Sequence, residues 1–109
     1  MRNALVFFQD QMAGILRETS QGYEFQYELA YLKNPKAQPI SFSFPLSEQI
    51  FKSPTLFPFF DGLIPEGWYL EIVSKALKVD SHDRFGLLLA TASHTIGAVT
   101  VRPEEGSPL

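Results

Sequence analysis

The chain has 109 residues and a net charge of −3, with 45% hydrophobic residues and no cysteine. This length and composition fit one domain with its own core, and the lack of cysteine excludes disulfides and thiolate-rich metal sites. The acidic balance and the scattered lysines and arginines argue against a nucleic-acid or anionic-membrane surface. We expect a single domain over residues 1–109, with a loose tail over about 103–109, in the reducing cytoplasm.

The first half of the chain predicts strands. Short apolar runs at 5–8 and 12–19 are separated by a polar turn, and Gly14 inside the second run indicates a bulge or a close backbone approach. Aromatic and aliphatic residues then alternate with mostly polar ones over 23–31, and again over 40–44. Alternation is typical of a strand with one apolar face, so these segments predict an antiparallel meander that needs cover on one face.

The second half predicts helices. A short helical turn is expected over 46–52. A longer helix is expected to start at Pro65 and Glu66 and to reach Lys78, since a proline and an acid suit a helix N-terminus. The apolar stripe of this helix is expected to face the core and comprises Leu70, Val73, Ala76 and Leu77.

A further helix and a closing strand complete the expected fold. Asp80 is expected to cap the helix, with Asp83 three residues on as the reciprocal carboxylate. β-Branched residues over 95–102 predict the strand. The fold class is therefore expected to be α+β, with a small antiparallel meander or hairpin sheet, two to three short helices and a closing strand. The buried face of the further helix is expected to comprise Phe85, Leu88, Leu89 and Ala92.

No set of residues has the spacing of a catalytic or metal site. His82 adjoins Asp83, but residues 80–83 fit the capped start of a helix better than an acid–base pair. Neither His82 nor His94 has a further zinc ligand at a usual spacing. The phosphate loop, strand lysine and catalytic-loop motif of protein kinases are missing from the sequence. We expect a non-enzyme with no catalytic residues, no metal and no cofactor.

Residues 56–68, the signature segment, are the most informative part of the chain. With the three residues before them they hold four aromatic residues, three prolines and two glycines. A stiff turn that displays aromatic side chains suits a protein interface. Phe57, Phe59 and Phe60 are expected mainly to cover the sheet. Trp68 precedes Leu70 by two residues, about 200° around a helix, so it is expected to point away from the buried stripe.

The signature segment resembles that of the HipA N-terminal domain family. Two later segments, 83–88 and 96–99, resemble further motifs of the same family in the same order, so the resemblance covers nearly the whole chain. In HipA toxins this module precedes a Ser/Thr kinase domain. Such kinases resemble enzymes that phosphorylate aminoacyl-tRNA synthetases.

The chain ends where that kinase domain would begin, so it is most similar to the HipS-type, stand-alone form of the module in tripartite HipBST toxin–antitoxin systems. The resemblance implies a non-catalytic antitoxin that binds and inhibits a HipT-like Ser/Thr kinase toxin. It also implies a ternary complex with a HipB-like DNA-binding protein, without direct contact to nucleic acid or membrane. We hypothesise that Trp68 enters the kinase near its active site. The residues expected to hold it there are Phe60, Asp61, Pro65, Glu66 and Gly67.

Three alternatives stay open. The chain could be the N-terminal scaffolding fragment of a longer HipA-like kinase, which a reading frame continuing past Leu109 would reveal. It could be a generic protein-binding module unrelated to toxins. It could also be a small enzyme with a site made of His82, Asp80 and Asp61, which would lose turnover when these are replaced by alanine.

Overall fold

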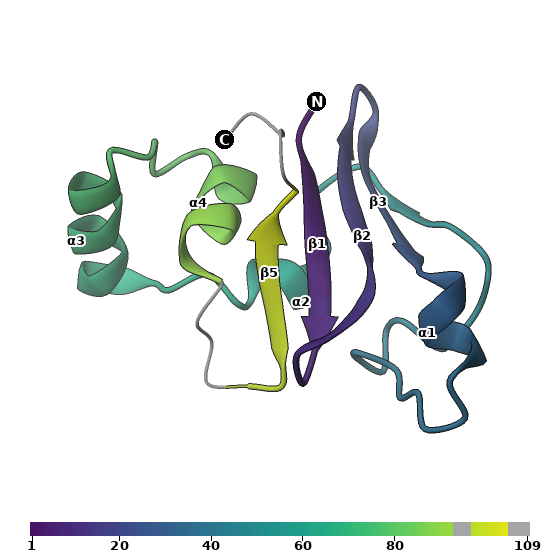
Figure 1. Cartoon of the computed structure of the whole chain (residues 1–109). Coiled ribbons are helices and arrows are strands. Elements are labelled where there is room, and N and C mark those ends of the chain that lie inside the picture. The colour runs from purple at the N-terminus through teal and green to yellow at the C-terminus, as the bar shows by residue number, and fades with distance from the viewer. Residues whose placement is uncertain (93–96, 105–109) are drawn as a thin grey trace.

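The computed structural model describes residues 1–92 and 97–104, apart from the side chains of Trp68, Tyr69 and Val73 (Figure 1). Within them a five-stranded antiparallel sheet has the strand order β4-β3-β2-β1-β5. The strands are β1 (Asn3–Phe8), β2 (Gln11–Thr19), β3 (Gly22–Tyr27), β4 (Phe51–Ser53) and β5 (Val99–Pro103). The helices are α1 (Leu29–Lys33), α2 (Pro58–Asp61), α3 (Gly67–Leu77) and α4 (Arg84–Thr91). The expected α+β class is confirmed.

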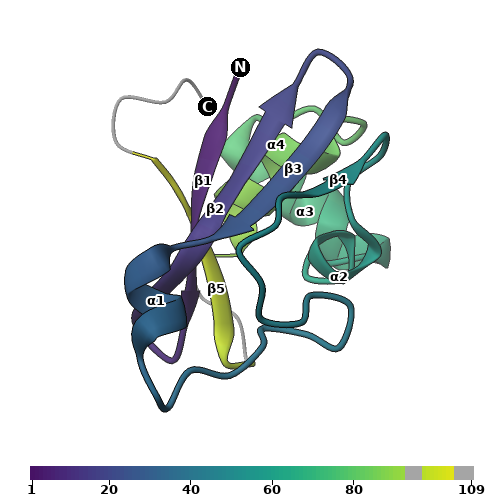
Figure 2. The ribbon, with the colours of Figure 1, turned by 90° about the vertical axis from the view of Figure 1, so that its right-hand side faces the viewer.

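Among the described residues, helices α2, α3 and α4 lie on one side of the sheet. Helices α2 and α4 lie behind it and α3 lies farther out on the same side, whereas α1 lies at the end of the sheet (Figures 1 and 2). The covered face is rich in phenylalanine because large rings fill the space between sheet and helices. Phe25 has ring-centroid distances of 4.9 Å to Phe44 and 5.7 Å to Phe60. Much of the aromatic excess of the sequence therefore serves the core.

Two tight hairpins align the first three strands. Gln9 and Asp10 take φ angles of 49° and 66° between β1 and β2, and Gly22 takes 137° at the start of β3. The register of β1 and β2 shifts after Val6, which pairs with Gly14. A Cβ atom at Gly14 would overlap the carbonyl oxygen of Gln26. The sequence expectation for Gly14 is confirmed, because a bulge and a close backbone approach occur together there.

Gly22 is expected to be one of the least replaceable residues of the sheet. Its backbone is in the left-handed region, and an added Cβ atom would overlap the carbonyl oxygen of Ser53 on β4. Gly22→Ala should lower the free energy of unfolding by roughly 2 kcal/mol or more, measured by urea denaturation. Gly97→Ala is the control, because nothing lies within 4 Å of its added Cβ atom. Equal urea midpoints for Gly22→Ala and Gly97→Ala would contradict the claim that the sheet requires glycine at position 22.

The alternation predicted over 23–31 is a strand only as far as Tyr27. Residues Leu29–Lys33 form α1 instead, and Tyr31 is buried there with its ring stacked on that of Tyr27 at 5.8 Å. The prediction was wrong after Tyr27, because Tyr31 is buried from a helix and not from a strand. Residues four apart share one face in a helix as they do in a strand, so the apolar spacing fits both.

The predicted strand over 40–44 and the predicted helical turn over 46–52 are both wrong. Residues 40–44 form a turn in which Ile40 and Phe44 are buried on either side of an exposed Phe42. This buried–exposed–buried order imitates the period of a strand. The fourth strand lies later, at β4, where Phe51 pairs with Phe25.

The second half follows the predictions more closely. Helix α3 and the closing strand β5 are confirmed within the described residues, and residues 95 and 96 lie outside them. Helix α4 begins later than expected, because the carboxylate of Asp83 accepts a hydrogen bond from the Gly86 N–H at 3.0 Å. The Asp80 carboxylate accepts from the His82 N–H at 2.9 Å instead, so Asp80 is not the cap.

The buried face of α4 agrees with the expectation, whereas the structure describes only the start of the C-terminal tail. The predicted buried face of α4 is confirmed and also includes Leu87. Strand β5 continues to Pro103, and the Glu104 N–H donates to the Asn3 carbonyl oxygen at 3.1 Å. Residues 105–109 of the expected loose tail lie outside the described residues.

Candidate binding surface

The first half of the signature segment belongs to the core. Phe57 and Phe60 are 8% and 0% exposed, and Phe59 packs on Phe60 with a ring-centroid distance of 5.2 Å. The expectation that these rings cover the sheet is confirmed. Phe60 was also predicted to help hold Trp68 in a partner. Its complete burial excludes direct contact with a partner in this conformation, so it can act only by supporting the surface from below.

Asp61 is bound by Arg84, a residue of the segment 83–88. Its carboxylate accepts a hydrogen bond from Arg84 Nε at 2.8 Å, and both side chains are partly exposed. This hydrogen bond raises the pKa of Arg84, and the charge of Glu66 adds to the effect. Arg84 at the start of α4 therefore connects the signature segment to the body of the domain through Asp61.

The exposed part of the segment is the turn into α3. Ile64 is buried, Pro65 is half-buried, and Glu66 and Gly67 are exposed. Gly67 takes a φ of 66°, and nothing lies within 4 Å of an added Cβ atom. Left-handed backbone favours glycine, so Gly67 sets the sharp change of direction with which α3 begins. Three of the six predicted site residues thus form one accessible turn.

Helix α3 exposes more apolar surface than expected. Leu70 packs against the core and Ser74 is only 8% exposed, so the 70/74 side of the helix faces the body. Leu77, which was predicted to be buried, is 50% exposed, and Ala76 is exposed as well. The prediction failed for these two residues because α3 stands apart from the sheet (Figure 1). The side chain of Val73, the fourth member of the predicted stripe, lies outside the described residues.

Ile72 is a candidate contact residue that the sequence prediction missed. Its side chain is 54% exposed on α3. In a helix, residues four positions apart lie on one face, and Ile72 follows position 68 by four. That spacing was a signal present in the sequence. The side chain of Trp68 lies outside the described residues, so its exposure stays a prediction.

Arg2, near the N-terminus, connects the start of α4 to strand β2 through two carboxylates. Arg2 donates to Asp83 at 2.7 Å and 2.9 Å and to Glu18 at 2.9 Å and 3.1 Å, and its guanidinium lies over the Phe85 ring. These bonds lower the pKa of both carboxyl groups and raise the pKa of Arg2. Arg2 and Asp83 are 81 residues apart, so no local pattern could predict the pair.

Arg2→Met is expected to lower the free energy of unfolding by about 2 kcal/mol at pH 7, since it leaves two part-buried carboxylates without their partner. The folded-state pKa values of Glu18 and Asp83 are depressed. Their stabilisation is therefore complete above the unfolded pKa values of about 4 and is lost as the pH falls through the folded values.

Urea denaturation of parent and variant between pH 7 and pH 3 measures this effect, and the difference between them should narrow toward pH 3. Arg102→Met is the matched control, because its ion pair with Asp10 is long, at 4.0 Å, and exposed. A difference between parent and Arg2→Met that does not change with pH would contradict this role for the ion pairs.

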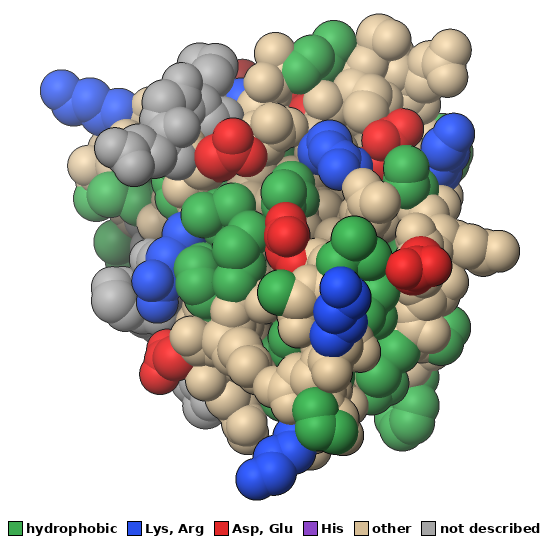
Figure 3. Space-filling model, turned by 45° about the vertical axis from the view of Figure 1, so that its right-hand side comes forward, with side chains coloured by type: hydrophobic (Ala, Val, Ile, Leu, Met, Phe, Trp, Pro, Cys, Tyr) green, Lys and Arg blue, Asp and Glu red, His purple; other side chains and the backbone are tan. Residues whose placement is uncertain are grey.

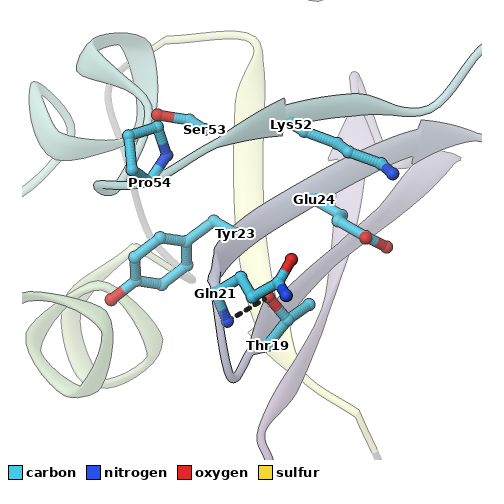
Figure 4. A pocket seen from close by; sticks show the side chains of 7 residues that line it. All are labelled: Thr19, Gln21, Tyr23, Glu24, Lys52, Ser53 and Pro54. Carbon is cyan, nitrogen blue, oxygen red and sulfur yellow. Dashed lines mark hydrogen bonds between the residues drawn. The ribbon is translucent and has the colours of Figure 1, made fainter.

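One hollow of the described part of the chain lies beside β4. Figure 4 shows this hollow of ≈ 220 Å³ between the β2–β3 turn and β4, where the Thr19 hydroxyl accepts from the Gln21 N–H at 3.2 Å. Its lining has hydroxyl groups but no histidine to activate them. It comprises Thr19, Gln21, Tyr23, Glu24, Lys52, Ser53 and Pro54.

The residues of the alternative enzyme site are engaged in separate pairs. His82 Nδ1 lies 3.3 Å from the Asp80 carboxylate in an exposed pair, whereas Asp61 is bound to Arg84. His94 lies outside the described residues. Among residues 1–92 and 97–104, no cluster of His, Asp and Glu could hold a metal ion. None of the helices described there is long and apolar enough to cross a membrane.

A five-stranded antiparallel sheet, short helices packed on it and a signature segment bound by Arg84 define a small α+β module. The HipA N-terminal domain family model matches residues 4–102, and the chain belongs to that family. The family expected from the sequence is therefore confirmed.

Individual relatives agree with this membership. The chain is 36% identical over 107 residues to an uncharacterized protein of Haemophilus influenzae, covering 96% of this chain and 95% of that protein. It is 32% identical over 85 residues to a Sinorhizobium fredii protein named "Putative kinase Y4mE", covering 78% of this chain but 20% of that protein. A solved structure described as the N-terminal domain of HipA toxin has a TM-score of 0.67 and 35% identity, covering 95% and 93% of the two chains.

Proposed function

We propose that this domain is a non-catalytic, cytoplasmic antitoxin of the HipS type, which binds a HipT- or HipA-type Ser/Thr kinase and inhibits it. The observation that carries the proposal is the end of the domain formed by Pro65, Glu66, Gly67 and α3. There a left-handed glycine starts a helix whose apolar residues Ile72 and Leu77 are half exposed. Ile72 follows position 68 by four residues and so lies on the same helix face, and a contiguous apolar ridge there would suit a protein-binding surface.

One relative supports a kinase as the partner, and another supports a stand-alone form of the domain. In the Sinorhizobium protein, a domain like this one accounts for about a fifth of a chain named as a kinase. The Haemophilus protein matches over nearly its whole length, so a related domain also occurs as a small protein of its own. If the domain of the Sinorhizobium protein packs against the rest of that chain, a separate copy would carry a matching surface.

Inhibition would follow from insertion of Trp68 near the kinase active site. The turn at Pro65–Gly67 directs the start of α3, and the ion pair of Asp61 with Arg84 holds that turn to the body. Aromatic anchors on stiff backbone dominate binding energy because little conformational freedom is lost when they are buried. A ring in a concave kinase cleft would exclude nucleotide or protein substrate from it.

Growth rescue tests this function. A HipT-type kinase gene is expressed from one promoter and the chain from another, and growth and co-purification are scored together. We expect the kinase alone to arrest growth and the chain to restore it with both proteins in one complex. Arrest that persists although the chain is soluble and abundant would contradict the proposal.

A HipB-like DNA-binding protein is proposed as the third member of the complex. The chain carries a net charge of −3, and phosphate contacts need clustered lysine or arginine. The chain would therefore reach operator DNA only through a basic partner. Gel-shift experiments test this: the chain should shift operator DNA when the DNA-binding protein is present and should not shift it alone.

A second candidate is a scaffolding module within a longer HipA-like kinase, which the match to the Sinorhizobium protein favours. The surface at α3 would then be covered by the kinase domain of the same chain. Western blotting of the native protein in its own cells distinguishes the two, because the antitoxin is a product of about 12 kDa and the scaffold is part of a much larger one.

A further inference from the structure

The start of helix α3 is held less firmly than its end. At the C-terminal end, the Val79 N–H donates to the Ser74 carbonyl oxygen at 3.0 Å, and Val79 packs against the core. At the N-terminal end, Glu66 is the N-cap residue, but within the described part of the chain its side chain makes no capping hydrogen bond. Gly67 follows with its φ of 66°. The direction in which α3 starts therefore needs support from outside the helix.

The chain before this start is fixed as far as Ile64. The Ile64 side chain is 3% exposed, and the Ile64 N–H donates to the Asp61 carbonyl oxygen at 3.2 Å. Pro65 comes next and has no N–H to donate. Pro65 and Glu66 thus form a short connection between the core and α3, with Asp61 before it and Glu66 at its end.

Arg84 lies beside this connection. Its Nε donates to Asp61 Oδ1 at 2.8 Å. The charge of Glu66 also raises the pKa of Arg84, so Glu66 lies within electrostatic reach of the same guanidinium. One cation therefore attracts carboxylates on both sides of the connection. Without it, the two negative charges would repel each other across the start of α3.

The backbone of Arg84 is well anchored. Asp83, the residue before it, accepts hydrogen bonds from Arg2 at 2.7 and 2.9 Å and from the Gly86 N–H at 3.0 Å. Phe85, the residue after it, is 0% exposed. Arg84 is therefore carried by a part of the domain whose position does not depend on α3.

We propose that Arg84 is a positioning residue for the kinase contact. By holding Asp61 and attracting Glu66, it sets the direction in which α3 starts. Position 68 is the second residue of that helix, so the same direction decides where its side chain is presented. This inference rests on the proposed function, because the contact that Arg84 positions is the one assigned there to Trp68 and α3.

A small change in this direction would displace the exposed apolar side chains of α3. The helix has 11 residues, so it is about 16 Å long, and a rotation of about 15° at its start would move its far end by about 4 Å. Ile72 and Leu77, 54% and 50% exposed, lie along this length. By contrast, hydrophobic side chains on a side of the molecule turned away from α3 form separate areas divided by charged ones (Figure 3). The fit of α3 to a partner therefore depends on how its start is held.

Two other roles for Arg84 give different results in one test. Its side chain is 32% exposed, so it could contact the kinase directly, or it could only stabilise the fold. A direct contact would weaken binding of the variant without altering the free domain. A purely stabilising role would lower the urea midpoint without altering the direction of α3.

The test compares the full parent chain with Arg84→Met, which removes the charge, and Arg84→Lys, which keeps it. Arg102→Met is the control for losing an arginine elsewhere, since its ion pair with Asp10 is long and exposed. Backbone N–H residual dipolar couplings of the free proteins report the direction of α3 relative to the sheet. Calorimetry with a purified HipT-type kinase gives the affinity, and urea denaturation gives the stability. If Arg84→Met does not fold, Arg84→Gln takes its place.

We expect the α3 couplings of the parent to fit the alignment of the sheet and those of Arg84→Met to be reduced below it. Arg84→Met should bind the kinase about 10-fold more weakly, with a urea midpoint close to that of Arg102→Met. Arg84→Lys should keep the couplings and bind within about threefold of the parent, because an ammonium group can donate the same single hydrogen bond.

Unchanged α3 couplings in Arg84→Met would overturn the proposal, whatever the affinity. Altered couplings with an affinity equal to that of the parent would overturn it as well. If the parent itself bound no kinase, the proposed function would fail, and the role of Arg84 in kinase binding would fail with it. The couplings would still show separately whether Arg84 directs α3.

Discussion

Trp68→Ala is expected to weaken binding to the kinase by about 30- to 1000-fold, while the free energy of unfolding changes by less than about 1 kcal/mol. Position 68 is the second residue of α3, one turn before the half-exposed Ile72. Alanine favours helix, so the helix itself should persist. Calorimetry with purified kinase gives the affinity, and urea denaturation gives the stability.

Two further α3 variants show whether the loss is specific to this surface. Ile72→Ala should weaken binding to a smaller extent, on the order of 10-fold, because it removes a smaller part of the same ridge. Glu71→Ala should have little effect, because it removes an exposed charged side chain and leaves the apolar ones in place. Affinity of Trp68→Ala within threefold of the parent would show that the anchor lies elsewhere.

Phe60→Ala is expected to lower the free energy of unfolding by about 3–5 kcal/mol, a large part of the stability of a domain of this size. The Phe60 ring is 0% exposed and contacts the rings of Phe25, Phe44 and Phe59 at centroid distances of 5.7, 5.5 and 5.2 Å. Its removal would leave a cavity that these rigid neighbours cannot fill.

Phe42→Ala is the matched control for this loss, since it makes the same substitution at a fully exposed position. Its unfolding midpoint should equal that of the parent within error. If Phe60→Ala unfolded at the parent's midpoint, the signature segment would not be part of the core, and its first half would be available to a partner after all.

The early strands and α3 could be predicted because each follows from local spacing. Residues 5–8 and 12–19 are apolar runs on either side of a turn, and the proline, acid and glycine before Trp68 mark a helix start. The turn at residues 40–44 could not be recognised, because its shape depends on the Tyr27 hydroxyl, a long-range contact that leaves no periodic signal.

The position of the candidate surface could be predicted from the sequence, but the ion pairs that hold it in place could not. The signature segment identified the turn at Pro65–Gly67, yet the bond from Arg84 to Asp61 and the bonds from Arg2 to Asp83 join residues 23 and 81 positions apart. Together they connect the residue before β1, the start of α4 and the signature segment. The two family motifs are therefore coupled physically, since Asp83 starts the helix from which Arg84 holds Asp61.

The central claim is that the domain acts by binding a kinase and carries out no reaction itself. Transfer of labelled phosphate from ATP to the kinase's protein substrate, measured as the purified chain is titrated, tests both parts. We expect the rate to fall linearly and to reach its minimum at one chain per kinase, with no transfer by the chain alone. An unchanged rate at a tenfold excess of chain, or phosphate transfer without the kinase, would contradict the claim.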